Sequence, residues 1–337
     1  MSAVFIRRVL ATTRSFRPSL PGFPRPIVGA AILVLIGQTS AAATDDRQPP
    51  VGQQLRPATS VSGRSGEQLE ERRRAAQSGD ARAQFDLGWI YASGLDVPRD
   101  YNQAVEWWQK AAAQGLADAQ LNLGVMYQAG VGVQKDNARA VEWYRKAAEQ
   151  GDVTASFNLG MAYDEGVGVE RDAERAAYWW RQAAERGNAL AQNYLGRAYH
   201  DGEGVSRDYA LALQWYRKAA EQGDAQSQSN LGFMYQNGEG VARDASQAVE
   251  WWRKAAELGH ASAQYNLAVA YHNGEGVMED FVESHKWVLI AAANASADRQ
   301  RKYSLLREAL AMKMTPAEIA EAENRAGQWL DSFGRKR

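Results

Sequence analysis

The sequence predicts an all-α fold in which helical hairpins stack on one another as a solenoid. The chain repeats itself every 36 residues, and each repeat contains two helical patterns joined by a glycine-rich turn. One hairpin cannot bury both of its faces, so its neighbours must supply the missing partner. The repeat therefore overrides the two globular domains that a length of 337 residues would otherwise suggest.

The repeat is visible when two stretches are aligned. "LGVMYQAGVGVQKDNARAVEWYRKAAEQGD" begins at Leu123, and "LGMAYDEGVGVERDAERAAYWWRQAAERGN" begins 36 residues later at Leu159. Six such repeats follow one another without gaps, at 80–115, 116–151, 152–187, 188–223, 224–259 and 260–295.

The first helix of each repeat carries a leucine, a glycine and, four residues after the leucine, a tyrosine. Leucine and tyrosine at this spacing share one helical face. Glycine inside a helix costs up to about 1 kcal/mol relative to alanine, so its recurrence predicts the close approach of a neighbouring helix. The glycines are Gly88, Gly124, Gly160, Gly196 and Gly232, with Ala268 in the sixth repeat.

The second helix begins after an aspartate, which is a preferred N-cap. Gln103, Gln247 and Glu283 are placed to complete a capping box in three repeats. Six of the eleven tryptophans share one slot in this helix and three occupy the next, which indicates core packing rather than a ligand site. The N-cap aspartates are Asp100, Asp136, Asp172, Asp208, Asp244 and Asp280. The helix-ending glycines are Gly115, Gly151, Gly187, Gly223 and Gly259.

Both ends of the array carry closing segments. Residues 67–79 match a second helix in which Glu71 replaces the tryptophan, so they form a polar capping half-repeat. Residues 296–337 abandon the repeat and are predicted to be C-terminal capping helices, the last beginning at Thr315 with Glu318 as its capping-box partner. An apolar stripe on that helix would seal the stack: Ile319, Ala322, Ala326 and Trp329.

The N-terminal segment predicts export. Residues 1–43 combine a basic start, the apolar run 27–37 and small residues spaced for cleavage, as in a secretory signal peptide. Eleven apolar residues are too few to span about 30 Å of hydrocarbon, so no stable membrane span is expected after cleavage, and the protein would be periplasmic or secreted. An uncleaved membrane anchor and a mitochondrial presequence are the alternatives. Residues 44–66, rich in proline, glutamine and serine, are predicted to be a disordered linker.

Composition and motifs argue against several functions. Beyond residue 43 the formal charge is −6, which does not favour nucleic-acid binding, and the chain has no cysteine for thiolate chemistry. The four histidines lack metal-ligand spacing, and the glycine-rich turns join helix to helix without the lysine and strand of a phosphate loop. We therefore expect no metal, no cofactor and no enzymatic activity.

The repeats resemble the Sel-one-like repeat family, relatives of the tetratricopeptide repeat. The fifth repeat, "AQSQSNLGFMYQNGEGVARDASQAVEWWRKAAELG" (Ala225 to Gly259), shows the pattern, and the resemblance covers residues 67–295. Asp96 and Ala268 depart from it at two glycine slots. The resemblance implies a right-handed α/α superhelix that serves as an adaptor or scaffold. It also implies a bacterial exported member, possible roles being regulation of envelope signalling or exopolysaccharide production.

The slot before the leucine-glycine pair is the candidate partner-binding site. In tetratricopeptide-like stacks the first helices line the concave face, where an asparagine can donate to and accept from a peptide backbone. The alternative is that these amides bond within the stack. The slot holds Asp86, Asn122, Asn158, Tyr194, Asn230 and Asn266, and nearby Trp89, Met161, Arg197 and Phe233 would set selectivity.

The leading functional hypothesis is a non-enzymatic scaffold that binds a protein or peptide on this concave face. Its partner and oligomeric state are unknown from the sequence. A glycan-binding or cell-wall-associated protein, or a hydrolase that uses the aromatic groove, is the alternative.

Overall fold

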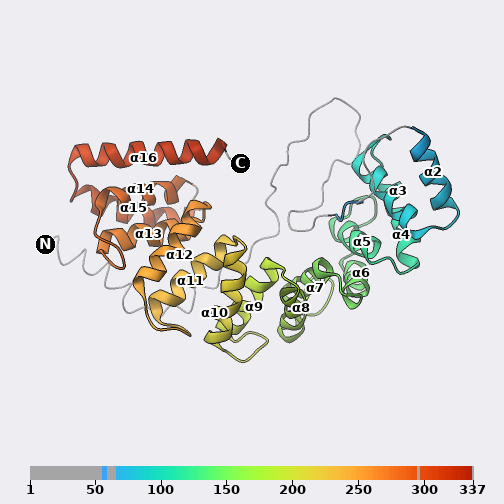
Figure 1. Ribbon diagram of the computed structural model, residues 1–337, viewed down its shortest axis with the longest axis horizontal. Coiled ribbons are helices and arrows are strands. Elements are labelled where there is room, and N and C mark those ends of the chain that lie inside the picture. The colour runs from blue at the N-terminus through green and yellow to red at the C-terminus, as the bar shows by residue number, and fades with distance from the viewer. Residues whose placement is uncertain (1–54, 59–65, 294–296, 336–337) are drawn as a thin grey trace. The chain divides into compact units, whose positions relative to one another are not determined.

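All secondary structure in the described part of the chain is helical. The computed structural model describes residues 55–58, 66–293 and 297–335, and these form fifteen helices and no strand (Figure 1). The predicted class, an α/α solenoid of 36-residue hairpins, is confirmed. Two compact units emerge: among the described residues, the N-terminal unit holds those up to 191 with 203–205, and the C-terminal unit holds 192–202 and 206–335.

The N-terminal unit consists of the half-repeat helix α2 followed by three hairpins. Within a hairpin the two helices pack together, and the second helices of the first two repeats pack on the first helix of the repeat that follows. The helices are α2 (Gly66–Gln77), α3 (Ala81–Ser93), α4 (Tyr101–Ala113), α5 (Ala117–Ala129), α6 (Asn137–Glu149), α7 (Val153–Glu165) and α8 (Ala173–Glu185).

The C-terminal unit contains most of α9 and all helices after it. Its repeats follow the same hairpin pattern, and α14 then packs against both α15 and α16. The helices are α9 (Ala189–Asp201), α10 (Tyr209–Glu221), α11 (Ala225–Asn237), α12 (Ala245–Glu257), α13 (Ala261–Asn273), α14 (Phe281–Ala293), α15 (Ala297–Ala311) and α16 (Pro316–Arg335).

The aspartate N-caps are confirmed, but the capping boxes predicted in three repeats are wrong. Asp100 Oδ1 accepts from the backbone N–H of Gln103 at 3.0 Å, as predicted. The backbone N–H of Asp100, however, donates to the carbonyl of Tyr91 at 2.9 Å, and the same aspartate-to-tyrosine bond recurs in every repeat. That donor is therefore unavailable to a capping box, and the Gln103 side chain donates to Glu106 instead.

The recurring helical glycine makes room for an aromatic ring of the same hairpin, which confirms the predicted close approach. A Cβ added at Gly124 would lie 2.4 Å from the Tyr144 ring, and one added at Gly160 would lie 2.5 Å from the Trp180 ring. These distances are far below van der Waals contact, so only glycine fits. The buried ring of the second helix is Trp108, Tyr144, Trp180, Tyr216 or Trp252.

The most regular tryptophan slot is less buried than the core prediction implies. Trp107 and its equivalents in the next four repeats are half-buried, and only Trp287 is fully buried. In four repeats a lysine one turn later covers the ring, as where Lys110 Nζ lies 4.0 Å from the Trp107 centroid. The core aromatic slot is the following one, because it faces the glycine.

The C-terminal helix closes its unit as the sequence predicts. The Thr315 backbone N–H donates to Glu318 Oε2 at 2.7 Å and the Glu318 N–H donates to Thr315 Oγ1 at 3.3 Å, which is a complete capping box. The Ala322 and Ala326 side chains are buried in the core shared with α13 and α14, and Trp329 packs edge-on against Trp287 with ring centroids 5.9 Å apart. The stripe therefore covers the last hairpin.

Candidate functional site

The predicted asparagine slot lies on the first helices, and its members are mostly buried. Asn122 is fully buried, Asn158 and Asn230 are each 5% exposed, and Tyr194 and Asn266 are half-buried. The four predicted selectivity residues, Trp89, Met161, Arg197 and Phe233, are half-buried. Their differing surroundings separate the slot into positions that contact a chain segment and positions that serve the stack.

Asn122, on α5, holds a segment of the chain's own backbone. Residues 55–58 are not helical and lie beside this helix. The Arg56 backbone N–H donates to Asn122 Oδ1 at 2.7 Å, and Asn122 Nδ2 donates to the Arg56 carbonyl at 3.2 Å. The amide therefore satisfies the donor and the acceptor of one residue of an extended chain, the contact expected of a peptide-binding asparagine.

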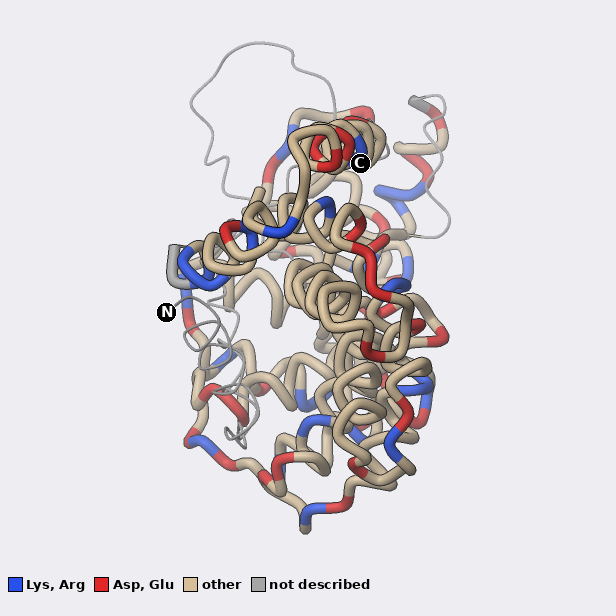
Figure 2. Tube along the Cα trace, turned by 90° about the vertical axis from the view of Figure 1, so that its left-hand side faces the viewer, with Lys and Arg blue, Asp and Glu red and all other residues tan. Residues whose placement is uncertain are grey.

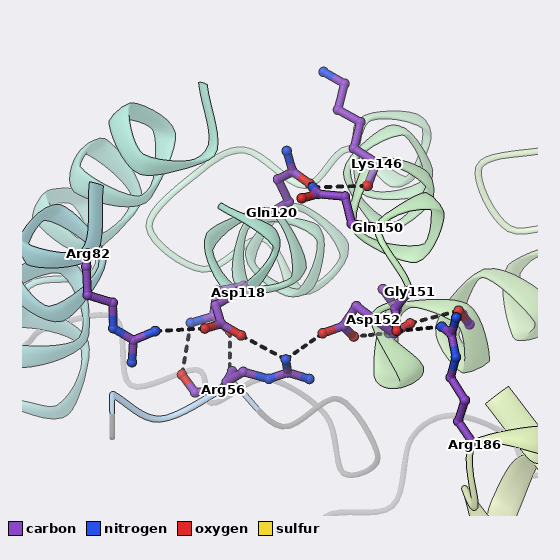
Figure 3. Close-up of polar contacts among 12 residues, drawn as sticks. Arg56, Arg82, Asp118, Gln120, Lys146, Gln150, Gly151, Asp152 and Arg186 are labelled. Carbon is purple, nitrogen blue, oxygen red and sulfur yellow. Dashed lines mark hydrogen bonds and ion pairs between the residues drawn. The ribbon is translucent and has the colours of Figure 1, made fainter. Parts of the chain in front are cut away.

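The Arg56 side chain lies between two carboxylates from neighbouring repeats (Figure 3). Its Nη1 lies 2.8 Å from Asp118 Oδ1 and 2.5 Å from Asp152 Oδ2. Partial burial lowers the pKa of Arg56, but the hydrogen bonds and charges of Asp118 and Asp152 outweigh it and raise that pKa above its ordinary value. The guanidinium is therefore held as a cation in an ion-pair site.

Helix starts position both carboxylates. Asp152 is the N-cap of α7, and its Oδ1 accepts from the Ala155 N–H at 2.8 Å while its side chain is 2% exposed. Asp118 lies in the first turn of α5, and its second oxygen pairs with Arg82 Nη1 of the preceding repeat at 2.9 Å. Helix N-termini favour negative charge, so both positions suit an acidic side chain.

Two other members of the slot contact the stack itself. Asn158 lies beside the hydroxyl of Tyr144 from the preceding repeat, and its amide nitrogen is buried with no hydrogen-bond partner in the described part of the chain. Asn230 lies beside Tyr216 in the equivalent place and accepts from Gln226 Nε2 at 3.0 Å. Both side chains therefore lie against residues of the repeat array.

Tyr194 and Arg197 contact each other rather than standing apart. The Arg197 guanidinium carbon lies 4.7 Å from the Tyr194 ring centroid, a cation–π geometry. In the fourth repeat Tyr194 therefore occupies the slot that Asn122 occupies in the second repeat.

The sequence reasoning missed Asp118 and Asp152 as site residues. The signal was a departure from the repeat, because the slot of Asp118 holds no other acidic residue. That slot contains Arg82, Asp118, Thr154, Leu190, Gln226 and Ser262 in the six repeats. The second and third repeats bring Asp118 and Asp152 to the side chain of Arg56, whose backbone Asn122 holds.

A buried glutamine row, also missed, links repeats on the same side. Gln120 Nε2 donates to the carbonyl of Ala112 at 3.3 Å, and Gln150 Nε2 donates to Gln120 Oε1 at 2.7 Å. Gln84 makes both of these bonds, with the Ala76 carbonyl and with Gln114, and in the C-terminal unit Gln222 Nε2 donates to Gln192 Oε1 at 2.7 Å. These residues are structural, because both partners belong to the stack.

Three glutamates in the glycine-rich turns are paired with basic side chains. Glu203 pairs with Arg171, and Glu275 pairs with Arg243. Glu239 Oε2 lies 2.9 Å from Nε2 of His200, whose Nδ1 lies 2.7 Å from Asp201. Burial lowers the pKa of His200, but the two carboxylates raise it to about 9. Acidic and basic residues are interspersed along the trace (Figure 2).

The described residues, 55–58, 66–293 and 297–335, contain no group of three or more histidine or acidic side chains arranged to hold a metal ion. Among their helices, none is long and apolar enough to cross a membrane. The apolar run 27–37 lies outside them.

The comparison with known proteins identifies the same 36-residue repeat. The family model described as the Sel1 repeat matches six times, at residues 81–116, 117–152, 153–188, 189–224, 225–260 and 261–296. Comparison with curated proteins gives no match.

Two solved structures share the fold. A Sel1 repeat protein from Oxalobacter formigenes is 34% identical with a TM-score of 0.56, over 67% of this chain and 94% of that one. A protective antigen of uropathogenic Escherichia coli, described as displaying an SLR fold, is 28% identical with a TM-score of 0.54, over 80% of this chain and 88% of that one.

Proposed function

Because the chain belongs to the Sel1 repeat family, whose solenoids generally serve as protein-interaction scaffolds, we propose that it binds an extended segment of a partner protein across its first helices. The binding surface includes Asn122 and the first-helix faces of the neighbouring repeats. The scaffold acts by holding its partner and catalyses no reaction.

The paired contact between Asn122 and the Arg56 backbone carries this proposal. A side-chain amide that bonds both polar groups of one residue recognises main chain, whatever side chain that residue has. Two such bonds contribute about 1–3 kcal/mol together, since a neutral hydrogen bond contributes about 0.5–1.5 kcal/mol. The contact supports a peptide as ligand, because a sugar has no N–H and C=O pair of this spacing in its backbone.

Export places the scaffold in the bacterial envelope or outside the cell. The basic start, the apolar run 27–37 and the small residues before Thr44 support a cleaved signal peptide. A regulator of envelope signalling or of exopolysaccharide production is the role we propose within that compartment, in line with the family resemblance. Mass spectrometry of the mature protein tests the location: a first residue near Thr44 is expected, and an intact Met1 would contradict it.

The binding proposal is tested with an unbiased library of displayed 12-residue peptides, panned on the purified full-length chain. Peptides enriched on the wild type should bind Asn122→Ala about five- to a hundredfold more weakly, because two main-chain hydrogen bonds are lost. Asn102→Ala is the matched control, since Asn102 is exposed on the second helix α4. Equal binding to Asn122→Ala and wild type would refute the proposal, as would a failure to enrich any peptide.

A further inference from the structure

We propose that Asp118 and Asp152 form a pocket for an arginine of the partner, and that residues 55–58 occupy this pocket in cis and compete with the partner. This inference rests on the proposed peptide binding and specifies its ligand as an extended segment that presents an arginine. The chain's own Leu55–Ala58 is the occupant in the structure (Figure 3).

The charges around the pocket require a cation. Asp118 is shared between Arg82 and Arg56, while Asp152 is paired with Arg56. Arg82 comes from α3 and belongs to the stack, so it stays when the segment leaves. Removal of Arg56 leaves two carboxylates facing one fixed arginine, and Asp152 then lacks the countercharge that it has in the structure. The net negative charge that remains attracts another cation to the pocket.

The pocket is a local departure from the repeat and not a requirement of the fold. The N-cap slot of Asp152 is filled in the other repeats by Asp80, Leu116, Asn188, Asp224 and His260. Leu116, which precedes α5, makes no side-chain cap bond, yet that helix forms. Hairpins therefore fold without this pair of acids. A second and independent observation is that the Arg56 backbone bonds to Asn122. It indicates that Asp118 and Asp152 receive an arginine carried on an extended chain segment.

The seated segment resembles a ligand more than a structural element. Its polar contacts with α5 and with the N-cap of α7 come from Arg56 alone, while Leu55 is half-buried, Pro57 is exposed and Ala58 is buried. A residue that precedes proline is restricted to extended conformations, so Arg56 is already arranged for the site. Only residues 59–65 join this segment to α2, which gives it a high effective concentration at the pocket. A partner with an extended arginine must displace it.

The experiment uses the full-length chain and a fluorescent peptide with the sequence of residues 51–62, VGQQLRPATSVS, measured by fluorescence polarisation. The Arg56→Ala protein should bind this peptide at least about tenfold more tightly than the wild type, because the cis competitor is weakened. The same peptide with glutamine in place of its arginine should bind Arg56→Ala at least about tenfold more weakly, because the ion pairs are lost.

Pocket variants in the Arg56→Ala background complete the test. Asp118→Asn with Asp152→Asn should abolish the preference for the arginine peptide, and folding is preserved because asparagine is an equally good N-cap. Asp80→Asn changes the equivalent N-cap of α3 and should leave the preference unchanged. Equal binding of the arginine and glutamine peptides would overturn the arginine pocket but leave peptide binding standing. Equal affinity of wild type and Arg56→Ala for the arginine peptide would overturn the cis competition. If neither peptide binds, this inference is wrong as a whole. The proposed function is tested separately by the peptide library.

Discussion

A methyl group added at Gly232 is expected to destabilise the C-terminal unit, although alanine is the better helix former. The new Cβ would lie 2.4 Å from Nε1 and Cδ1 of Trp252, so the ring must move by about 1 Å to reach van der Waals contact. Trp252 is only 6% exposed, and its Nε1 donates to the Ser229 carbonyl at 3.3 Å. Movement of the ring therefore strains the core and weakens that bond.

The three contributions can be compared. Overpacking of a core costs about 1–3 kcal/mol, and loss of the indole hydrogen bond costs about 0.5–1.5 kcal/mol. The gain in helix propensity from glycine to alanine offsets about 1 kcal/mol. Gly232→Ala should thus lower the free energy of unfolding by about 2 kcal/mol. Urea unfolding followed by tryptophan fluorescence measures this change, and hydrogen exchange of α11 and α12 amides locates it, because repeat arrays can open in parts.

Two further substitutions make the prediction refutable. Gly327 lies in α16 with no atom within 4 Å of an added Cβ, so Gly327→Ala should raise stability by about 0.5–1 kcal/mol. The sixth repeat carries Ala268 opposite Val288, both buried, where the fifth has Gly232 opposite Trp252. Trp252→Val should therefore relieve Gly232→Ala, and the double variant should be at least about 1 kcal/mol more stable than the sum of the single effects. An increase in stability for Gly232→Ala, or purely additive effects, would refute the packing argument.

Three other predictions concern caps and titrating groups, each measured as urea midpoints. The pKa of His200 is raised to about 9, so its stabilising contribution is complete below about 6.5 and lost as pH rises through 9; His200→Gln should flatten the profile over that window. The pH dependence from His260 has the opposite sign, because burial and the charge of Arg299 lower the pKa of His260 to about 4. Its stabilising contribution is present above pH 6.5 and is lost as pH falls toward 4. His260→Asn should remove that loss of stability while keeping the N-cap of α13. Thr315→Ala should cost about 0.5–2 kcal/mol by removing the cap of α16, and an unchanged midpoint would contradict the capping box.

The sequence was sufficient for the features that depend on local chemistry or on the repeat. The aspartate N-caps follow from the affinity of a carboxylate for free helix amides, and the glycine slot follows from its cost within a helix. The capping boxes in three repeats failed because a tertiary partner, the tyrosine carbonyl of the first helix, takes the aspartate N–H. Local pattern reasoning cannot include a competitor supplied by another helix.

Arg56 could not be placed from the sequence for a different reason. The composition of residues 44–66 predicts a segment without enough apolar surface to form a core, and that argument concerns burial alone. Arg56 is held by main-chain hydrogen bonds and ion pairs, which leave no hydrophobic pattern to detect in the sequence. The slot of Asn122 was predicted from the face of the helix it occupies, but which asparagine receives a chain segment depends on the acids around it.

Recurrence and departure from the repeat have different meanings in a chain of this kind. Packing is sufficient to explain a recurring residue type only where its neighbours also recur, as for Asn158 and Asn230 beside Tyr144 and Tyr216. Asn122, in the same slot, has a different neighbour, because it bonds the Arg56 backbone. A residue that departs from the pattern without loss of the hairpin is not explained by packing. Asp118 is such a residue, and it contacts a segment outside the array. In a repeat scaffold, ligand specificity is therefore better sought at positions where the repeats differ than at positions where they agree.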